Sequence, residues 1–475
     1  MNQIKTLYEI YLNCNQKICI DSRSEEIKNA VFFAIQGNNF NGNNFIEDAF
    51  SKGAKYAVSD DIELLKNKNN KAIFLVENTL QTLQNLATYH RKFLNIPIIA
   101  ITGSNGKTTT KEILTHILNS SFNPLSTRGN FNNHIGVPLT LLSINKQHDI
   151  AVVEMGANHV GEIEELCKIT QPTHGIITNI GDAHLKGFGS LENIKIAKNE
   201  LFEYLKEHHR TIIYNTEDEI LTKLVSDYEN TRGYINPCWI ENATGPLKYQ
   251  YTTKPFLTIE NINLKSNKWS QYHSKEIQTK LIGKHNINNI SAAIEIAEIF
   301  NISPPSIGTQ LNDFKLANNR CEFIETKKNK ILLDAYNANP TSMSSGILNF
   351  KDWNNYNLLL NKKSQQNYRG DKMLFILGDM LELGKDEVKY HQEIIDLLAK
   401  EIGPRPRVIL VGSIFNKTIT SKLKHKEDLI DFSYCEKVKS NIEAVNIIKK
   451  ENFSNMSIFI KGSRKLQLEK LVDYL

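Results

Sequence analysis

The chain has 475 residues, of which 40% are hydrophobic and 23% charged, and its formal net charge is +5. This length predicts two or three domains of a globular protein, and the even spread of the lysines gives no support to nucleic-acid binding. The six cysteines form no C-x-x-C pair, which argues against a zinc site and a disulfide framework. The N-terminus is polar and no apolar run approaches about 20 residues, which argues against a signal peptide and a membrane span. We therefore expect a cytoplasmic protein.

Residues 1–95 are predicted to form a small α/β unit. Its strands and helices are expected at 31–35, 45–52, 56–58, 72–76 and 79–93. Two polar segments stand out, D-S-R at 21–23 and Q-G-N-N-F-N-G-N-N-F at 36–45, and composition alone makes them loops. Pro97 marks a boundary before the next strand.

The segment 98–111, I-I-A-I-T-G-S-N-G-K-T-T-T-K, is the most informative in the chain. Its apolar start predicts a buried parallel strand, and the apolar positions after residue 111 predict a helix. Gly103 and Gly106 therefore lie where free backbone N-H groups and the helix dipole bind an anion. Lys107 would reach the phosphates and the Thr108 hydroxyl would ligate Mg²⁺. A plain turn is the alternative, and the earliest glycine of the usual P-loop spacing is replaced by Ile101.

The central unit, 96–315, is predicted to alternate strands and helices as a parallel sheet. One strand ends on Glu154, and another, at 175–179, is followed by His184. Ligands of such sheets bind at the carboxyl ends of the strands, so both side chains are expected near the phosphates.

Three polar features of the central unit are candidates for ligand contact. The loop G-N-F-N-N-H-I-G-V-P contains Asn130, Asn132 and Asn133. Lys198 lies beside the apolar stripe of a helix that Ser190 would cap, where a solvated lysine is the alternative. Asn286 and Asn289 share one helical face and would bind an adenine edge or cap the helix.

The last unit, 316–475, is predicted to be a second doubly wound sheet of Rossmann type. Its strands are expected at 331–333, 373–377, 408–411 and 458–460. The polar stretch 353–371 is predicted to be an insertion between elements. The fold class is therefore α/β with three domains, in which a central P-loop sheet is flanked by a small N-terminal domain and a C-terminal Rossmann-like domain.

Taken together, the segments resemble the Mur ligases over nearly the whole chain. They occur in that family's order: D-S-R with F-F-A-I-Q-G, T-G-S-N-G-K-T-T, G-N-F-N-N-H-I-G-V-P, V-E-M-G-A-N-H, N-I-G-D-A-H-L, A-K-N-E-L-F, G-K-H-N-I-N-N, N-R-C-E, D-A-Y-N-A-N-P-T-S-M, L-G-D-M-L-E-L-G and K-G-S-R. Many nucleotide enzymes share the P-loop. The combination of G-N-F-N-N, Y-N-A-N-P and L-G-D-M-x-E-L-G is far more specific.

The resemblance implies roles for matching residues. The catalytic group would be Lys107, Glu154, His184 and Lys198, with Thr108, Glu154, His184 and a carbamylated Lys198 holding two Mg²⁺ ions. ATP would contact Gly103, Ser104, Asn105, Gly106, Lys107, Thr108, Thr109, Asn286, Asn289, Arg320 and Asp334. The other substrates would contact Asp21, Ser22, Arg23, Asn130, Asn132, Asn133, Tyr336, Asn337, Asn339, Lys461 and Arg464, the first three at the uridine part.

The implied activity is an ATP-dependent amide ligation through an acyl phosphate, in cytoplasmic peptidoglycan precursor synthesis. The motifs are closest to the member that adds D-alanyl-D-alanine to UDP-MurNAc-tripeptide, and we expect a monomer that binds these small molecules. One alternative is another ligase of the superfamily with a different amine acceptor, such as a folylpolyglutamate-type enzyme. The others are a non-catalytic nucleotide-binding regulatory protein and a kinase.

Overall fold

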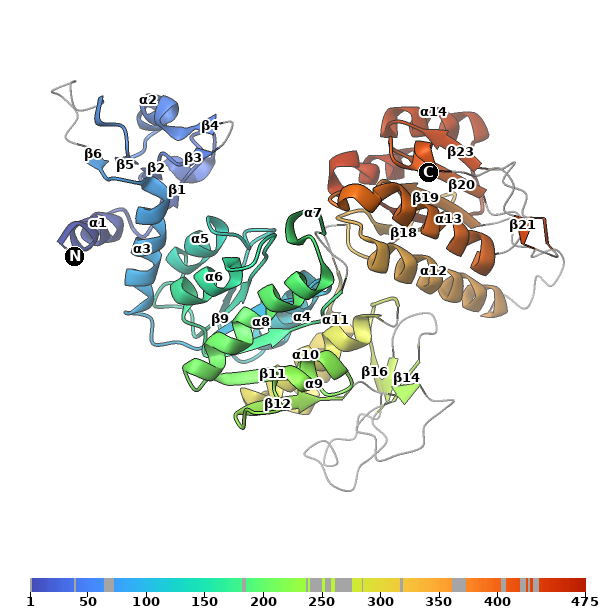
Figure 1. Cartoon of the computed structure of the whole chain (residues 1–475), viewed down its shortest axis with the longest axis horizontal. Coiled ribbons are helices and arrows are strands. Elements are labelled where there is room, and N and C mark those ends of the chain that lie inside the picture. Colours follow the sequence, from blue (N-terminus) through green and yellow to red (C-terminus); the bar gives the residue numbers. More distant parts are fainter. Residues whose placement is uncertain are drawn as a thin grey trace.

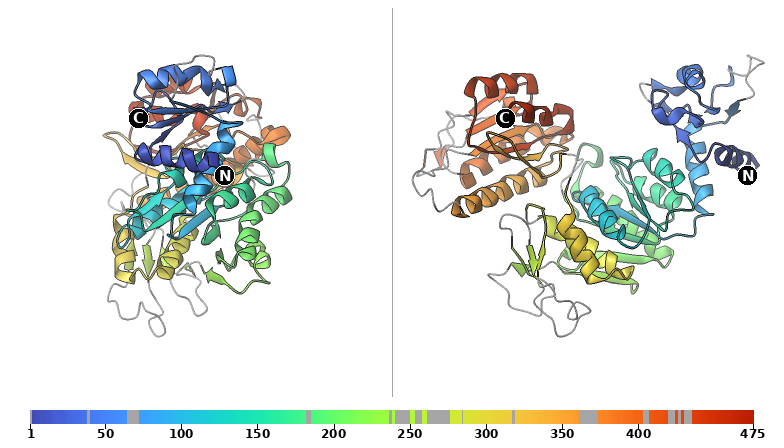
Figure 2. Two further views of the ribbon diagram at one scale, coloured as in Figure 1. Left: turned by 90° about the vertical axis from the view of Figure 1, so that its left-hand side faces the viewer. Right: turned by 180° about the vertical axis from the view of Figure 1, so that it is seen from behind.

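The computed structural model describes residues 2–37, 40–63, 72–181, 185–235, 238–239, 250–252, 258–260, 276–283, 285–316, 319–360, 373–402, 407–418, 424–425, 428–429 and 435–475. The chain forms three α/β units, and Figures 1 and 2 show the first and last standing on opposite sides of the middle one. The predicted fold class is confirmed. Among the described helices, none combines the length and the hydrophobicity that crossing a membrane requires.

The N-terminal unit is a four-stranded parallel sheet in the order β1-β2-β5-β6. Its strands are β1 Ile18–Cys19, β2 Val31–Phe33, β5 Tyr56–Ser59 and β6 Ile73–Leu75, beside a hairpin of β3 Gln36–Gly37 and β4 Phe40–Asn41. Its helices are α1 Asn2–Asn13, α2 Ile46–Ser51 and α3 Thr79–Arg91. Asn78 caps α3 by accepting a hydrogen bond from the Gln81 N-H.

The central unit is a six-stranded parallel sheet in the order β12-β11-β10-β7-β9-β8. Its strands are β7 Ile98–Thr102, β8 Pro124–Ser126, β9 Ile150–Glu154, β10 His174–Ile177, β11 Thr211–Asn215 and β12 Thr231–Tyr234. The helices are α4 Lys107–Leu118, α5 Gly136–Leu142, α6 Glu162–Thr170, α7 Leu185–Phe188, α8 Leu191–Glu207, α9 Glu219–Leu224, α10 His285–Ile299 and α11 Pro304–Asp313. A small sheet follows β12, with β13 Cys238–Trp239, β14 Gln250–Thr252, β15 Thr258–Glu260 and β16 Glu276–Gln278.

Both faces of the central sheet are covered, which explains its continuous apolar strands. In β7, Ile98 and Ala100 belong to one core cluster, while Ile99 and Ile101 belong to the other. The first cluster includes residues of α5, α6 and α8 and continues into α1 and α3 of the N-terminal unit. The N-terminal and central units therefore share one hydrophobic core.

The C-terminal unit is a six-stranded sheet in the order β17-β18-β24-β19-β20-β23, parallel except for the β17–β18 pair. Its strands are β17 Glu322–Glu325, β18 Lys330–Asp334, β19 Met373–Gly378, β20 Arg407–Val411, β23 Cys435–Val438 and β24 Ser457–Lys461. Its α-helices are α12 Pro340–Leu360, α13 Glu387–Ile402 and α14 Asn441–Glu451, and a short hairpin is formed by β21 Lys424–His425 and β22 Asp428–Leu429.

The predicted insertion at 353–371 is wrong over its first part. The helix α12 continues to Leu360, and Trp353 is buried, with its ring against Phe350 and Phe323. Buried apolar residues of α12, such as Ile347, Phe350 and Trp353, hold this helix against the sheet, and the polar residues directly after Trp353 continue it. Residues 361–372 lie outside the described residues.

Candidate active site

The loop between β7 and α4 has the backbone form that a phosphate loop requires. Gly103 and Gly106 have φ angles of 141° and 81°, in the region that favours glycine. A Cβ on Gly103 would lie 2.1 Å from Thr178 Oγ1, and one on Gly106 would lie 2.4 Å from Asn289 Oδ1. Gly106 directly precedes α4, so the free N-H groups of the first helical turn lie at the loop.

Lys107 folds back over this loop. Its Nζ donates to the carbonyl oxygens of Gly103 at 2.5 Å and Ser104 at 3.1 Å. Burial lowers the pKa of the Lys107 amine, against the opposing effect of Glu154. A phosphate in the loop would give this amine an anionic partner.

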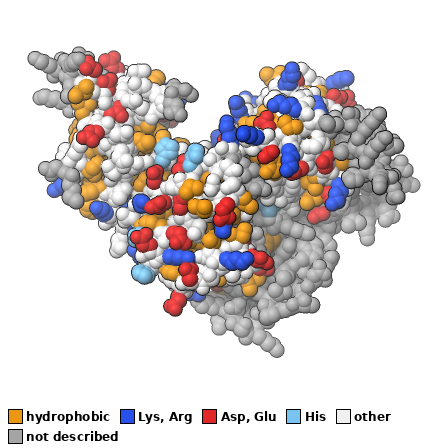
Figure 3. Space-filling model, viewed as in Figure 1, with side chains coloured by type: hydrophobic (Ala, Val, Ile, Leu, Met, Phe, Trp, Pro, Cys, Tyr) orange, Lys and Arg blue, Asp and Glu red, His pale blue; other side chains and the backbone are white. Residues whose placement is uncertain are grey.

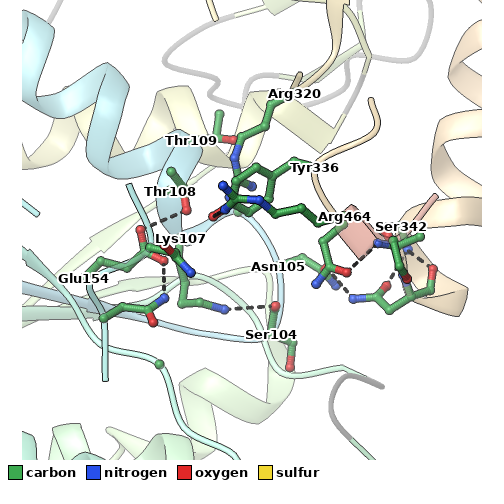
Figure 4. A pocket seen from close by; sticks show the side chains of 18 of the residues that line it. Ser104, Asn105, Lys107, Thr108, Thr109, Glu154, Arg320, Tyr336, Ser342 and Arg464 are labelled. Carbon is green, nitrogen blue, oxygen red and sulfur yellow. Dashed lines mark hydrogen bonds between the residues drawn. The ribbon is translucent and has the colours of Figure 1, made fainter. Parts of the chain in front are cut away.

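Glu154, at the end of β9, is only 2% exposed and is held on both oxygens. Thr108 Oγ1 donates to Oε2 and Asn132 Nδ2 donates to Oε1, each at 2.8 Å (Figure 4). No cationic side chain forms an ion pair with Glu154 in the described part of the chain. A hydroxyl beside an unpaired carboxylate is a ligand set that suits Mg²⁺.

The segment after β10 is joined to the phosphate loop. Ser104 Oγ donates to the Gly181 carbonyl at 2.7 Å, and the Asn179 side chain accepts from the Asn105 N-H and donates to the Asn105 carbonyl. This places Gly181 beside the loop. His184 lies outside the described residues.

Lys198, on α8, is 3% exposed, so the solvated alternative is wrong. Its Nζ lies 5.4 Å from the centroid of the Phe188 ring and makes no hydrogen bond or ion pair with any residue that the structure describes. Burial, reinforced by the nearby Lys107 charge, lowers the pKa of Lys198 to about 7. Such an amine is largely neutral just above neutral pH, the form that reacts with CO₂.

Asn286 and Asn289 lie behind the phosphate loop on α10, both nearly fully buried. Asn289 Oδ1 accepts from Thr110 Oγ1 at 3.1 Å, and its Nδ2 donates to Asn286 Oδ1 at 3.0 Å. Asn286 in turn donates to the Ile282 carbonyl at 2.9 Å. This chain of hydrogen bonds ties α10 to α4. Their predicted contact with adenine stays a prediction.

The C-terminal unit contributes a cationic wall. The Arg320 guanidinium lies 3.7 Å from the centroid of the Tyr336 ring, and that of Arg464 lies 5.1 Å from it (Figure 4). Stacking on an aromatic ring holds Arg320 without using its N-H donors, and within the described ranges these donors make no hydrogen bond, so they can bind a phosphate.

An ion pair lies beside this wall at the ends of two neighbouring strands. Lys461 Nζ, at the end of β24, contacts Asp334 Oδ2 at 2.5 Å and donates to the Asn337 carbonyl at 3.1 Å. Burial alone would raise the pKa of Asp334, but Lys461 holds it below its ordinary value.

A hydrogen bond between two asparagines joins the central and C-terminal units. Asn339 precedes α12 and accepts from the Ser342 N-H, which caps the helix. Its Nδ2 also donates to Asn105 Oδ1 in the phosphate loop at 2.8 Å. A second contact runs from the Lys186 N-H to the Glu382 carbonyl at 3.0 Å.

A cavity of about 740 Å³ lies between these elements. It brings together the predicted residues from Ser104 to Thr109, the asparagines of the 130–133 loop, Glu154, Asn286, Asn289 and all the predicted residues of the C-terminal unit. Gly103 and Lys198 do not line it, and neither do the three predicted residues of the N-terminal unit. Figure 3 shows a notch between the N- and C-terminal units, with Lys and Arg side chains on its C-terminal side.

Asp21, Ser22 and Arg23 follow β1, at the carboxyl edge of the N-terminal sheet. Asp21 accepts from the Arg23 N-H and pairs with its guanidinium at 2.9 Å. The Arg23 hydrogen bonds are the main reason that the pKa of Asp21 falls to about 2. Ser22 is buried.

Some residues that line the cavity or anchor its loops belong to the recognised motifs but were not predicted as site residues. Asn158 and Glu162, in and just after M-G-A-N-H, line the cavity, as does Glu382 in L-G-D-M-L-E-L-G. Asp379 of the same motif is buried and accepts from the N-H groups of Ile414 and Phe415 at 2.9 Å, which fixes the loop after β20. The motifs gave the signal, but one sequence does not separate ligand contacts from loop anchors.

Comparison with known proteins extends the likeness to the whole chain. Residues 101–297 match the Mur ligase middle domain. The UDP-N-acetylmuramoyl-tripeptide–D-alanyl-D-alanine ligase of Bacillus subtilis is 34% identical over 464 residues, which cover 96% of this chain and 92% of that protein. The protein of the same name from Buchnera aphidicola is 33% identical, covering 99% and 94%. The crystal structure I of MurF from Acinetobacter baumannii has a TM-score of 0.77 and 28% identity, covering 96% of this chain and 92% of that one.

Proposed function

The chain belongs to the Mur ligase family, and on that premise we propose that it joins D-alanyl-D-alanine to UDP-MurNAc-tripeptide while converting ATP to ADP and phosphate. Identity over nearly the full length to ligases of that name supports the substrate pair. The product is a peptidoglycan precursor, so the reaction serves cell-wall growth and with it cell shape and division. We place the enzyme in the cytoplasm as a monomer.

Each unit has a proposed task. Residues 1–95 bind the UDP end of the substrate, with Asp21, Ser22 and Arg23 at the sheet edge where ligands of parallel sheets collect. Residues 96–315 bind ATP at the phosphate loop. Residues 316–475 close over the nucleotide and bind the dipeptide, with Tyr336, Asn337, Asn339, Lys461 and Arg464 as the proposed contacts.

The first step activates a carboxylate, because a carboxylate and an amine do not condense in water unaided. An oxygen of the tripeptide's terminal carboxylate attacks the γ-phosphorus of ATP, the bond to the bridging oxygen breaks, and ADP leaves. The product is an acyl phosphate. Lys107 and the N-H groups at the start of α4 bind the phosphate charge, and Arg320 adds its free donors from the facing unit.

In the second step the dipeptide amine attacks the acyl carbonyl carbon. Inorganic phosphate leaves with one former carboxylate oxygen, and the amine nitrogen loses its extra proton. Holding three substrates in line is the larger part of the task. Closure of the C-terminal unit, already in contact through Asn105 and Asn339, brings the amine to the acyl group.

We propose two Mg²⁺ ions at this site. Thr108 and Glu154 would hold one, and the resemblance to Mur ligases adds His184 and a carbamylated Lys198 as further ligands; bound there, the ions would neutralise charge on the phosphates. The buried Lys198 amine, which has no hydrogen-bond partner among the described residues, supports carbamylation because its pKa is about 7. Asn132 keeps Glu154 oriented toward Thr108.

The observation that carries the proposal is the convergence of Lys107, Thr108, Glu154 and Arg320 on one cavity. The test is phosphate release from ATP with UDP-MurNAc-tripeptide and either D-Ala-D-Ala or single amino acids. We expect release with D-Ala-D-Ala only. Release with a single amino acid instead would identify a different ligase, and ATP binding without turnover would identify a regulatory protein.

A further inference from the structure

The N-terminal unit is joined to the central unit through the end of α3. Figure 1 shows α3 running from the N-terminal sheet to the central unit. Its first residue, Thr79, donates to the Ala34 carbonyl at 3.2 Å and to Asp60 Oδ2 at 3.2 Å, beyond the carboxyl ends of β2 and β5. Asp21 to Arg23 follow β1 at the same sheet edge. With 13 residues, α3 spans about 20 Å from that edge to the central unit.

At its other end, α3 presents a buried arginine to backbone carbonyls. Arg91 is 8% exposed, and its guanidinium donates to the carbonyls of Leu94 at 2.6 Å, Thr170 at 3.0 Å and Gln171 at 3.2 Å. No carboxylate forms an ion pair with it in the part of the chain that the structure describes. Thr170 and Gln171 end α6, where free carbonyls and the negative end of the helix dipole favour a cation.

A parallel contact holds the end of α5. His90 Nε2 donates to the Ile144 carbonyl at 2.9 Å while its Nδ1 accepts from Tyr8 at 3.1 Å. Tyr11 of α1, fully buried, donates to the Leu142 carbonyl at 2.6 Å. Both α5 and α6 therefore end on side chains of the N-terminal unit.

The same two helices begin at the reaction cavity. Asn133 lines the cavity and accepts from the Gly136 N-H at the start of α5. Glu162, the first residue of α6, also lines it. The cavity and the joint are thus opposite ends of two rigid helices.

From this geometry we propose that Arg91 is a positioning residue. It fixes the angle of α3 relative to the central unit, and with it the distance between the UDP-binding edge of the N-terminal unit and the phosphate loop. The proposal rests on the proposed function, because only a substrate that binds the N-terminal unit at its UDP end and the central unit at its peptide end depends on that distance. ATP is bound by the central and C-terminal units and does not depend on it.

The test replaces Arg91 with Met, which keeps apolar volume and removes the three hydrogen bonds. We expect the KM for UDP-MurNAc-tripeptide to rise about tenfold, with the KM for ATP unchanged, because a small misplacement of one substrate end is enough to lose this much. A MurNAc-tripeptide without the UDP group should be used by the variant and the wild type with equal kcat/KM. Lys92→Met, at the exposed neighbouring position, is the matched control.

If Arg91 had a purely structural role, Arg91→Met would lower kcat through loss of folded enzyme and leave both KM values unchanged. That result would overturn the proposal. If Arg91→Met does not fold, Arg91→Lys keeps a donor for the carbonyls and should give a smaller rise in the same KM. An unchanged KM in the lysine variant would then count against it. A failure of the proposed function is distinguishable from this result, because the wild-type protein itself would then release no phosphate with these substrates.

Discussion

At the scale of single residues, Glu154 is a carboxylate held in place by two neutral donors. Thr108 and Asn132 fix both oxygens, and the charge itself stays without a cationic partner among the described residues. A negative charge that is buried in this way indicates a site built for a cation.

We therefore predict that Glu154→Gln lowers the rate of phosphate release at least about 100-fold, because it keeps the shape and removes the charge. Steady-state phosphate release with all three substrates measures it. Glu325→Gln, on the exposed β17 position, is the control and should be fully active. Full activity of Glu154→Gln would remove Glu154 from the metal site.

Lys198 gives a prediction about pH and CO₂. Its pKa of about 7 lies below the ordinary 10.5, so the folded protein holds the neutral amine above pH 7. Carbamylation needs that neutral form. In CO₂-depleted buffer, added bicarbonate should restore activity at pH 8 and have little effect at pH 6, and the intact mass should show the carbamate only where activity returns. Equal activity with and without bicarbonate at pH 8 would contradict this role.

The same shift has a consequence for stability. Between pH 7 and 10.5 the unfolded chain binds a proton at Lys198 that the folded chain does not, so the free energy of unfolding should rise with pH across this window. In Lys198→Met that part of the rise should be missing. Chemical denaturation in CO₂-free buffers at several pH values measures it, and identical slopes in both proteins would count against the buried amine.

At the scale of elements, the phosphate loop depends on Gly106. Its φ of 81° and the close approach of Asn289 leave no room for a side chain, so Gly106→Ala must move either the loop or α10. We predict at least a tenfold loss of ATP affinity, measured by titration calorimetry. Gly308→Ala on α11, where a Cβ would meet Ile277 at an ordinary 3.6 Å, should bind ATP as the wild type does.

Local sequence patterns predicted most of the elements. The strands β7, β18, β19 and β20 and the Ser190 cap of α8 agree with expectation, because apolar runs and capping residues act over a few positions. The continuation of α12 past Trp353 was missed, since its stability comes from packing against Phe323 on a different element. The burial of Lys198 was equally invisible, because helix periodicity does not show what covers a side chain.

At the scale of the whole molecule, the three units are unequally joined. One core cluster runs from α1 and α3 into the central sheet, whereas the two clusters of the C-terminal unit include Ile282 as their one buried residue from the described part of the central unit. Its described hydrogen bonds with the central unit include those from Asn339 to Asn105, from Lys186 to Glu382 and from Asn349 to His285. The C-terminal unit therefore shares less buried core with the central unit than the N-terminal unit does, and we expect it to be the one that moves.

We predict that a non-hydrolysable ATP analogue with Mg²⁺ lowers the radius of gyration in solution scattering, while the distance between labels on the N-terminal and central units stays constant. The shared core resists the second change. An unchanged radius, or movement of the N-terminal unit alone, would contradict this division.

The sequence could not place the units relative to one another. Residues 21–23 and the phosphate loop were both predicted as substrate contacts, yet only the phosphate loop lines the cavity. We attribute the distance between them to the hydrogen bonds of Arg91, His90 and Tyr11 with the central unit. Their partners Thr170, Ile144 and Leu142 lie 79, 54 and 131 positions away in the chain, so they leave no local sequence pattern. The motifs therefore predicted many of the residues that line the cavity, whereas they did not predict the distance between the cavity and residues 21–23.

The central claim is that this cavity activates a carboxylate by transferring phosphate to it. The most direct measurement labels the terminal carboxylate of UDP-MurNAc-tripeptide with a heavy oxygen isotope and follows the label during ligation to D-Ala-D-Ala. We predict one labelled oxygen in each phosphate released. Ligation with release of unlabelled phosphate, the lost carboxylate oxygen being found in AMP or water instead, would contradict it.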